Sequence, residues 1–587
     1  MTMIHNGVET KLSGVQCTPL LSFLQQGDTD VAVHSPCGGK KSCGKCKIRI
    51  LSGECDEPTA KELSFLTSAE IASGVRLACF AQVLGDVTAE IPSEAAQVLT
   101  AVSKGGRLSP LAKRCVVRME EPSLADQRDD WTRLKDALAM PEAECTPALL
   151  AKLPKALRDG SFVATVTMVG RNVVVDIQAC ESDAPLYGLA VDIGTTTVVM
   201  ALINLQTGAV VDMENGLNRQ KSFGGDVISR IQHALENEGG GAALQSAIVN
   251  QLNDFAAVLC ARNGLQTEVI HAITLVGNTV MTHLLLGLPT AEIAKAPFIP
   301  VCNETMKAPA GMLGLRLHPD AVAVVAGGVS AYVGGDVTAG MLSSGMAQSD
   351  ELSLFIDIGT NGEIALGSRA AMVSCSTAAG PAFEGGHIRC GTGGVTGAIN
   401  SVRIVDGKPV FTTIGEKPPI GLCGSGVLDV TAALLDAGIL DETGYLETDD
   451  EIDDVAVYPI TEDVYFSAKD VREIQLAKAA VRAGIDTLLH ELNANEEDVQ
   501  NVYLAGGFGN YMDKDSAVRI GLIPSVLRDK IVPIGNAAGS GAIQLLLDDA
   551  AQLELQGLRA KITYFELSAN PFFQGAYVEQ MMFPEEL

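Results

Sequence analysis

The feature that most constrains the fold is a short pattern that occurs twice. AVDIGTTT spans Ala190–Thr197, and FIDIGTNGE spans Phe355–Glu363. In each copy an apolar run ends in Asp, a turn of small residues follows, and a second run rich in β-branched residues begins. This order predicts a tight strand–turn–strand hairpin rather than a strand, loop and helix. Two copies in a chain without other repetition predict a duplicated fold that holds a nucleotide between its halves.

The residue types of the two turns suit a phosphate ligand. Glycine lets the backbone approach a ligand closely, so that N–H groups and Thr hydroxyls can surround phosphate oxygens. A carboxylate at each strand end, Asp192 and Asp357, can hold Mg²⁺, usually through water. A single D-x-G-T is weak evidence, because Gly-Thr turns often close hairpins, so the duplication carries the prediction. The candidate phosphate ligands are Gly194, Thr195, Thr196, Thr197, Gly359, Thr360, Asn361 and Gly362.

Two further glycine-rich stretches extend this nucleotide site. In VYLAGGFGNYMD a buried strand is expected to end at Gly506 and Gly507, where an adenine or ribose could lie against the backbone. Asp336 follows two glycines in YVGGDV and either orients an attacking water or caps the next helix. The chain has no G-x-x-x-x-G-K-S/T sequence, and no G-x-G-x-x-G opens a helix after a strand, which excludes P-loop and Rossmann sites.

Four cysteines near the N-terminus have the spacing of an iron–sulfur site. Cys37, Cys43 and Cys46 form C-x5-C-x2-C, and Cys79 follows after 32 residues. Four thiolates around a glycine-rich loop suit a 2Fe–2S cluster, although the plant-type first gap has four residues. Zinc is the competing interpretation, but zinc sites usually pair their ligands in two close knuckles, whereas the distribution here is three plus one. Cys55 is expected to be an ordinary buried thiol.

The chain divides into four parts by composition and pattern. Residues 1–94 form the cysteine-bearing module, 95–108 a linker containing SKGG, 109–187 a small α+β domain, and 188–587 the part with the two hairpins. Nothing in residues 109–187 gathers titratable groups, so the function of this domain is not visible from the sequence.

Histidines and cysteines of the C-terminal part are not expected to bind metal. His283 falls on the apolar face of a helix and is expected to be a hydrogen-bonded core histidine. Cys375, His387 and Cys390 lie near one another in the chain, but their spacings fit no common metal site.

Charge and composition limit the binding partners and the cellular compartment that can be expected. The formal charge of −29 argues against nucleic acid as a partner. No apolar run is long enough to cross a bilayer, and the polar start lacks the layout of a signal peptide. A cytoplasmic location is therefore expected, with the 14 cysteines reduced.

The order of these motifs resembles known proteins at two levels. The two hairpins and the late Gly-Gly are similar to the superfamily of actin, sugar kinases and heat-shock chaperone ATPases. Over nearly its full length, with NRQKSFGGDVISRI, STAAGPAFEGGHI, GSGVLDV and LAGGFGNYMD, the chain resembles the reductive activators of corrinoid proteins. The resemblance implies a β-grasp 2Fe–2S ferredoxin domain with Cys37, Cys43, Cys46 and Cys79 as ligands, a small α+β middle domain, and a duplicated ribonuclease-H-like α/β ATPase domain.

The resemblance also implies a function. A corrinoid protein of an anaerobic methyltransferase system, serving O-demethylation or the acetyl-CoA pathway, occasionally loses an electron from Co(I). The family returns inactive Co(II) to Co(I) with ATP, Mg²⁺ and a 2Fe–2S cluster. A low-potential electron donor and a homodimer are further expectations. The nearest alternatives are an ATP-dependent activator of a radical dehydratase and an ATP-binding redox regulatory protein. A small-molecule kinase would have no use for the cysteine module.

Overall fold

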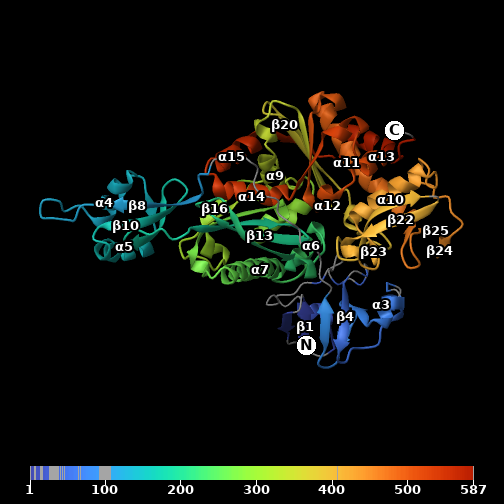
Figure 1. Cartoon of the computed structure of the whole chain (residues 1–587), viewed down its shortest axis with the longest axis horizontal. Helices are drawn as coiled ribbons and strands as arrows, with labels where there is room; N and C mark the ends of the chain where they lie inside the picture. Colours follow the sequence, from blue (N-terminus) through green and yellow to red (C-terminus); the bar gives the residue numbers. More distant parts are fainter. Residues whose placement is uncertain are drawn as a thin grey trace.

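The computed structural model describes residues 2–5, 8–12, 17–24, 33, 39, 41, 44, 46–63, 65–66, 68–91, 108–405 and 407–585. Figure 1 shows three parts: an N-terminal unit in blue, a second unit in cyan, and a large body that runs from green to red. We call residues 108–186 the linker unit. The body contains two lobes, each built on one six-stranded sheet.

The N-terminal unit is a small mixed sheet with short helices. Its five strands lie in the order β2-β1-β7-β4-β5, with β1 parallel to β7, and Met3, Ile48 and Leu77 are completely buried beneath it. This is the β-grasp arrangement that the resemblance implied. The elements are β1 (Thr2–His5), β2 (Val8–Lys11), β3 (Thr18–Pro19), α1 (Leu20–Leu24), β4 (Lys47–Ser52), α2 (Ala60–Leu63), α3 (Ser68–Ala72), β5 (Val75–Leu77), β6 (Gln82–Val83) and β7 (Thr88–Ile91).

The linker unit packs two helices on a four-stranded sheet of order β8-β10-β11-β9. Leu134, Leu149 and Leu157 fill its own core. Leu111 and Val175 instead join a second core that includes residues of the large body, so the unit is docked on the body. The elements are β8 (Ala112–Arg118), α4 (Asp130–Leu138), β9 (Glu144–Cys145), α5 (Pro147–Asp159), β10 (Val163–Val169) and β11 (Val173–Ala179).

The first lobe contains the first repeated motif. Strand β12 pairs antiparallel with β13 and parallel with β15, in the sheet order β14-β13-β12-β15-β17-β16. The elements are β12 (Tyr187–Ile193), β13 (Thr197–Asn204), β14 (Val210–Leu217), α6 (Val227–Glu236), α7 (Gly240–Arg262), β15 (Ile270–Gly277), α8 (Thr279–Leu286), β16 (Met306–Pro309), β17 (Val322–Val325) and α9 (Gly335–Ser344).

The second lobe repeats this topology. Strand β18 pairs antiparallel with β19 and parallel with β27, in the order β28-β27-β18-β19-β20-β29. The main elements are β18 (Ser353–Ile358), β19 (Gly362–Gly367), β20 (Met372–Thr377), α10 (Gly424–Asp436), α11 (Ala468–Leu492), β27 (Asn501–Ala505), α12 (Gly506–Tyr511), α13 (Lys514–Arg519), β28 (Ile531–Gly535), α14 (Ala537–Leu547), α15 (Ala551–Lys561), β29 (Ile562–Tyr564) and α16 (Pro571–Glu579). Two small sheets are added by β21 (Ala398–Val405), β22 (Lys408–Thr413), β23 (Gly421–Leu422), β24 (Glu451–Ile452), β25 (Val455–Pro459) and β26 (Tyr465–Ser467).

Both lobes therefore have the ribonuclease-H-like strand order, which confirms the duplicated α/β fold. In each, the repeated motif supplies the central strand and its hairpin partner. Helices α9 and α14 pack closely, because glycines replace side chains where the two helices meet. A Cβ on Gly541 would lie 2.2 Å from the carbonyl oxygen of Ala339, and one on Gly340 would lie 3.3 Å from the Cβ of Ala537.

Candidate functional site

The two hairpin turns have the geometry that the sequence predicted. Gly194 N–H donates to the carbonyl of Thr197 (3.0 Å), and Gly359 N–H donates to the carbonyl of Asn361 (2.9 Å). A Cβ on Gly194 would lie 2.6 Å from the Thr197 carbonyl oxygen, so only glycine fits this turn without a shift. The aspartates Asp192 and Asp357 occupy the same position in β12 and β18, next to the last residue of each strand.

Carboxyl groups gather around these turns. Burial raises the pKa of Asp192 to about 7, and the charge of Asp336 adds to the shift. Burial raises the pKa of Asp357 to about 7 as well, followed by the charges of Asp336, Asp192 and Glu384. The pKa of Asp336 rises to about 6 through burial. Half-buried carboxyl groups that disfavour each other's ionisation need a cation in order to be charged together, and their oxygens form the donor set of an oxygen-ligated Mg²⁺.

A fifth acidic residue, which the sequence analysis did not single out, belongs to this cluster. Burial raises the pKa of Glu363 well above its usual value, and the charges of Asp336 and Asp357 raise it further. Its carboxylate accepts from the Ser376 hydroxyl (3.4 Å). Glu363 is the last residue of the second copy of the repeated motif. Its position in that hairpin is the sequence feature from which its role could have been predicted.

Asparagine and arginine side chains from distant parts of the chain support the first turn. Asn278 Nδ2 donates to Thr195 Oγ1 (2.8 Å), and Asn218 Nδ2 donates to the Gly194 carbonyl (2.8 Å). The completely buried Arg230 donates through Nη2 to the Thr195 carbonyl (2.5 Å). Asn536, the N-cap of α14, donates to Asp192 Oδ2 (2.9 Å). Asn218 and Arg230 lie in NRQKSFGGDVISRI, a segment that the sequence analysis quoted as part of the family resemblance.

The second turn is supported by Glu384. Thr360 Oγ1 donates to Glu384 Oε2 (3.0 Å), and a Cβ on Gly359 would lie 3.3 Å from the other carboxylate oxygen. Glu384 lies in the segment STAAGPAFEGGHI. This segment therefore contacts the second hairpin.

The glycines expected at the adenosine lie beside the carboxylates. Strand β27 ends at Ala505, and Gly506 begins α12 with φ of +82°. A Cβ on Gly506 would lie 2.6 Å from Asp357 Oδ1, so the backbone passes directly against this carboxylate. Phe508 stacks on Phe383, with ring centroids 4.9 Å apart.

Asp336 does not cap its helix. The N-cap of α9 is Gly334, and Asp336 lies in the first turn, where its Oδ1 accepts from Val337 N–H (2.8 Å). The cap interpretation was therefore wrong, and the charge of Asp336 acts on the carboxyl groups of both hairpins.

Two of the four expected cluster ligands lie in the described residues. Cys46 and Cys79 are buried thiols whose sulfurs are 3.3 Å apart. The nearby Gly44 is buried and has φ of +65°, and a Cβ there would meet the Phe65 ring at 2.7 Å. Cys37 and Cys43 lie outside the described residues. Cys55 forms an isolated β-bridge with Val83 and is half-buried rather than fully buried, and burial raises the pKa of its thiol.

The expectation for His283 is confirmed. It is buried, its Nδ1 contacts the Thr279 carbonyl (2.7 Å), and its Nε2 accepts from Val301 N–H (3.1 Å).

The expectation that residues 109–187 gather no titratable groups was wrong. Asp176 of β11 faces His271 and His318 of the first lobe, and within the described ranges these three side chains have potential metal-ligand atoms that all lie within 4.8 Å of one another. No local pattern predicts this group, because the three residues are far apart in the chain.

Comparisons with known proteins agree with this architecture. Four family profiles match in succession: the 2Fe-2S iron-sulfur cluster binding domain (residues 3–84), the RACo linker region (101–183), the RACo middle region (187–349) and the C-terminal domain of RACo, the ASKHA domain (351–587). The chain is 30% identical over 575 residues to the corrinoid activation enzyme RamQ of Eubacterium limosum, covering 94% of each chain. It is 25% identical to the [Co(II) methylated amine-specific corrinoid protein] reductase of Methanosarcina barkeri, covering 68% of this chain and 77% of the relative.

A solved structure described as a reductive activator for corrinoid, iron-sulfur protein matches with a TM-score of 0.76 and 33% identity, covering 99% of this chain and 98% of that one. Fold and site together define an ATPase of the sugar kinase, actin and chaperone class joined to a 2Fe–2S ferredoxin domain. Within that class, the chain belongs to the family of reductive activators of corrinoid proteins. No helix in the described part of the chain is long and apolar enough to span a membrane.

Proposed function

We infer that this chain is an ATP-hydrolysing iron–sulfur reductase that returns a corrinoid protein from Co(II) to Co(I) by transferring one electron. Family membership supports this function, and so do the names of the relatives, which act on corrinoid proteins. The observation that carries the ATP-dependent part is the cluster of Asp192, Asp336 and Asp357 between two equivalent phosphate-type turns. These features also favour the reductase over a small-molecule kinase, which would not need the cysteine module.

The proposed site residues have distinct roles. Asp192 and Asp357 hold Mg²⁺, and the backbone of the two turns surrounds the phosphates. Gly506 and Gly507 accommodate the adenosine. Asp336, with a pKa of about 6, is largely ionised at neutral pH and can accept a proton from the attacking water.

Coupling to ATP has an energetic reason. The 2Fe–2S cluster supplies single electrons, and plant-type ferredoxin clusters have potentials near roughly −400 mV. The cobalt couple of the family lies lower, and for one electron each ~59 mV corresponds to a tenfold unfavourable equilibrium. We propose that nucleotide binding closes the two lobes and selects a conformation of the corrinoid protein in which the cobalt is easier to reduce.

The test measures cobalt reduction with and without ATP. Reduced protein is mixed with a Co(II) corrinoid protein, and the Co(I) absorption band is followed. Wild type should form Co(I) only with Mg-ATP, and Asp357→Ala should fail while its 2Fe–2S absorption spectrum stays unchanged. Full activity of Asp357→Ala would contradict the site assignment. ATP-dependent reduction of a radical dehydratase, with no effect on any corrinoid protein, would favour the alternative function.

The remaining expectations are proposals of the same kind. A low-potential donor reduces the N-terminal cluster, and a reconstitution series with candidate ferredoxins identifies it. The chain forms a homodimer in the cytoplasm, which sedimentation analysis and cell fractionation test.

A further inference from the structure

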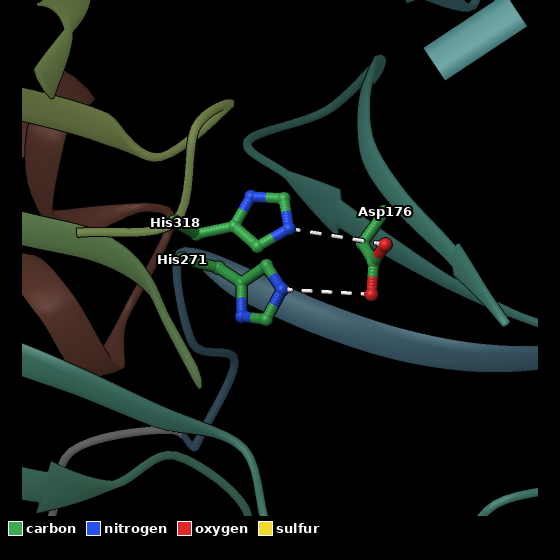
Figure 2. Close-up of side chains that lie close together, drawn as sticks. All are labelled: Asp176, His271 and His318. Carbon is green, nitrogen blue, oxygen red and sulfur yellow. Dashed lines mark ion pairs between the residues drawn. The ribbon is translucent and has the colours of Figure 1, made fainter. Parts of the chain in front are cut away.

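A carboxylate of the linker unit meets two histidines of the first lobe. Asp176 comes from β11, His271 is the second residue of β15, and His318 lies just before β17. Figure 2 shows both imidazole rings directing a ring nitrogen toward the carboxylate. His271 Nε2 is 3.8 Å from Asp176 Oδ2, and His318 Nε2 is 3.8 Å from Asp176 Oδ1. The site therefore joins two separately folded parts of the chain.

The carboxylate of Asp176 lies in a poorly solvated place. The residue is 9% exposed. Gln178 Nε2 donates to Asp176 Oδ2 at 3.0 Å and is neutral. A buried carboxylate of this kind requires a positive partner.

Two cations of the linker unit act on this site through their charge only, and the charge of Asp176 acts on Arg114. Arg114 of β8 donates to the Ala184 carbonyl (2.5 Å) and to Thr167 Oγ1 (3.3 Å). Lys152 of α5 acts on His318 through its charge, but its side chain is exposed. Neither forms an ion pair with Asp176 among the described residues.

The orientation and protonation of the His271 ring are those of a metal-binding histidine. Its Nδ1 lies 2.9 Å from the Val269 carbonyl, so this nitrogen must carry the proton, and a lone pair remains on Nε2. That Nε2 is buried and has no hydrogen-bond partner in the described part of the chain, although His271 is only 2% exposed. Histidine ligands of metals characteristically donate their other ring N–H to a carbonyl or carboxylate in this way.

The spacing of the three groups also fits a shared ion. At 3.8 Å the N···O separations are too long for hydrogen bonds. Two ligands that each lie about 2.0–2.2 Å from one ion are separated by roughly 3.3–3.8 Å at ordinary ligand angles. The potential ligand atoms all lie within 4.8 Å of one another. We propose that Asp176, His271 and His318 bind one divalent transition-metal ion of the zinc class, which fastens the linker unit to the first lobe.

Metal binding requires one rearrangement at His318. Its Nδ1 accepts from Asp320 N–H (3.2 Å), which places the proton of the neutral ring on Nε2. Ligation moves that proton to Nδ1, and the ring turns out of its stack on His271, where the centroids are 4.4 Å apart. Asp320 Oδ2, which is buried and has no partner within the described ranges, is the nearby acceptor for an Nδ1 proton.

The ion would complete a set of contacts that dock the linker unit. Asp320 Oδ1 already accepts from Thr146 Oγ1 of the linker unit (2.9 Å), and Lys113 pairs with Asp549 of the second lobe (2.7 Å). The linker unit directly follows the segment that connects it to the ferredoxin domain, so the ion fixes the anchor from which that domain extends.

The test uses the full chain with its cluster intact. Wild type, Asp176→Asn and His271→Gln are equilibrated with micromolar ZnCl₂, desalted and analysed for zinc and iron. His387→Gln is the matched control, because His387 is exposed and pairs with Glu473 (3.5 Å). Wild type and the control should retain about one zinc per chain beyond the iron, and the two site variants should bind zinc about 10–100-fold more weakly. Zinc K-edge absorption of wild type should show nitrogen and oxygen ligands without sulfur.

Three results would overturn the proposal. One is wild type without stoichiometric zinc, and another is zinc held by sulfur, which would place the ion at the cysteines. The third is a zinc-free protein whose melting temperature rises below about pH 6 in wild type but not in His271→Gln. That outcome would assign the site to a proton shared between imidazole and carboxylate. The zinc K-edge spectrum is measured on wild type alone. It therefore tests the proposal even if the variants fold poorly.

Discussion

The carboxyl cluster predicts a steep pH dependence of cation binding near neutral pH. Asp192 and Asp357 each have a pKa of about 7, so both are mostly protonated at pH 6 and mostly ionised at pH 8. A group with pKa 7 is about one-tenth ionised at pH 6 and nine-tenths ionised at pH 8, a tenfold change for each ligand. If the cation needs both charges, its affinity should fall about 100-fold between pH 8 and pH 6, which corresponds to ~2.7 kcal/mol.

Mn²⁺ reports this affinity directly. Free Mn²⁺ is measured by electron paramagnetic resonance in protein with an oxidised, diamagnetic cluster, without nucleotide, so that protonation of ATP does not contribute. Asp336→Asn removes the charge that raises the pKa of both ligands, so its affinity should depend less on pH between 6 and 8. An affinity that is constant across this range in wild type, or an Asp336→Asn profile identical to that of wild type, would refute the reasoning.

Three further predictions follow from the same site. Gly506→Ala places a methyl group 2.6 Å from Asp357 Oδ1 and strains a residue with φ of +82°, so calorimetry should show at least about tenfold weaker ATP binding. The metal-free protein should melt at a lower temperature at pH 8 than at pH 6. A raised carboxyl pKa means that the folded state is more stable when the group is protonated, and this stability is lost as the pH rises through about 7. Mg-ATP should remove the difference between the two melting temperatures. Gly541→Ala overpacks α14 against Ala339 and should cost about 1–3 kcal/mol in denaturant unfolding, whereas Gly557→Ala, with open space around it, should not destabilise the protein.

The sequence predicted the parts of the site that depend on local patterns. Each hairpin needs an alternating apolar run, a glycine turn and β-branched residues within one short segment, so the pattern alone places Asp192 and Asp357 at strand ends. The same holds for Gly506, which follows a short apolar strand. In each case the determining interactions lie within a few residues along the chain.

Contacts between distant segments could not be predicted in this way. Asn278 and Asn536 reach the first hairpin only because β15 and α14 are placed beside it by the sheet order and by helix packing. Asp176 and His271 face one another because the linker unit docks on the first lobe, and no periodicity in either segment indicates that docking. The cap assigned to Asp336 was wrong because two glycines precede it and the helix begins at the second of them.

The geometry of the site also indicates how nucleotide binding can move the lobes. Helix α9 carries Asp336 in its first turn, and α14 begins at Asn536, which holds Asp192. The same two helices make the glycine-dependent contact near the interface of the lobes, so both begin at the carboxyl cluster and pack on each other within a few residues. In the proposed site, a cation that neutralises the cluster would remove repulsion at the ends of this helix pair, and phosphates bound by both turns would draw the two hairpins together. Because closely packed helices shift as rigid bodies rather than deform, a change at their first turns is transmitted to both sheets. Nucleotide binding can therefore supply free energy at the contact between α9 and α14, where the two lobes must move for the site to close.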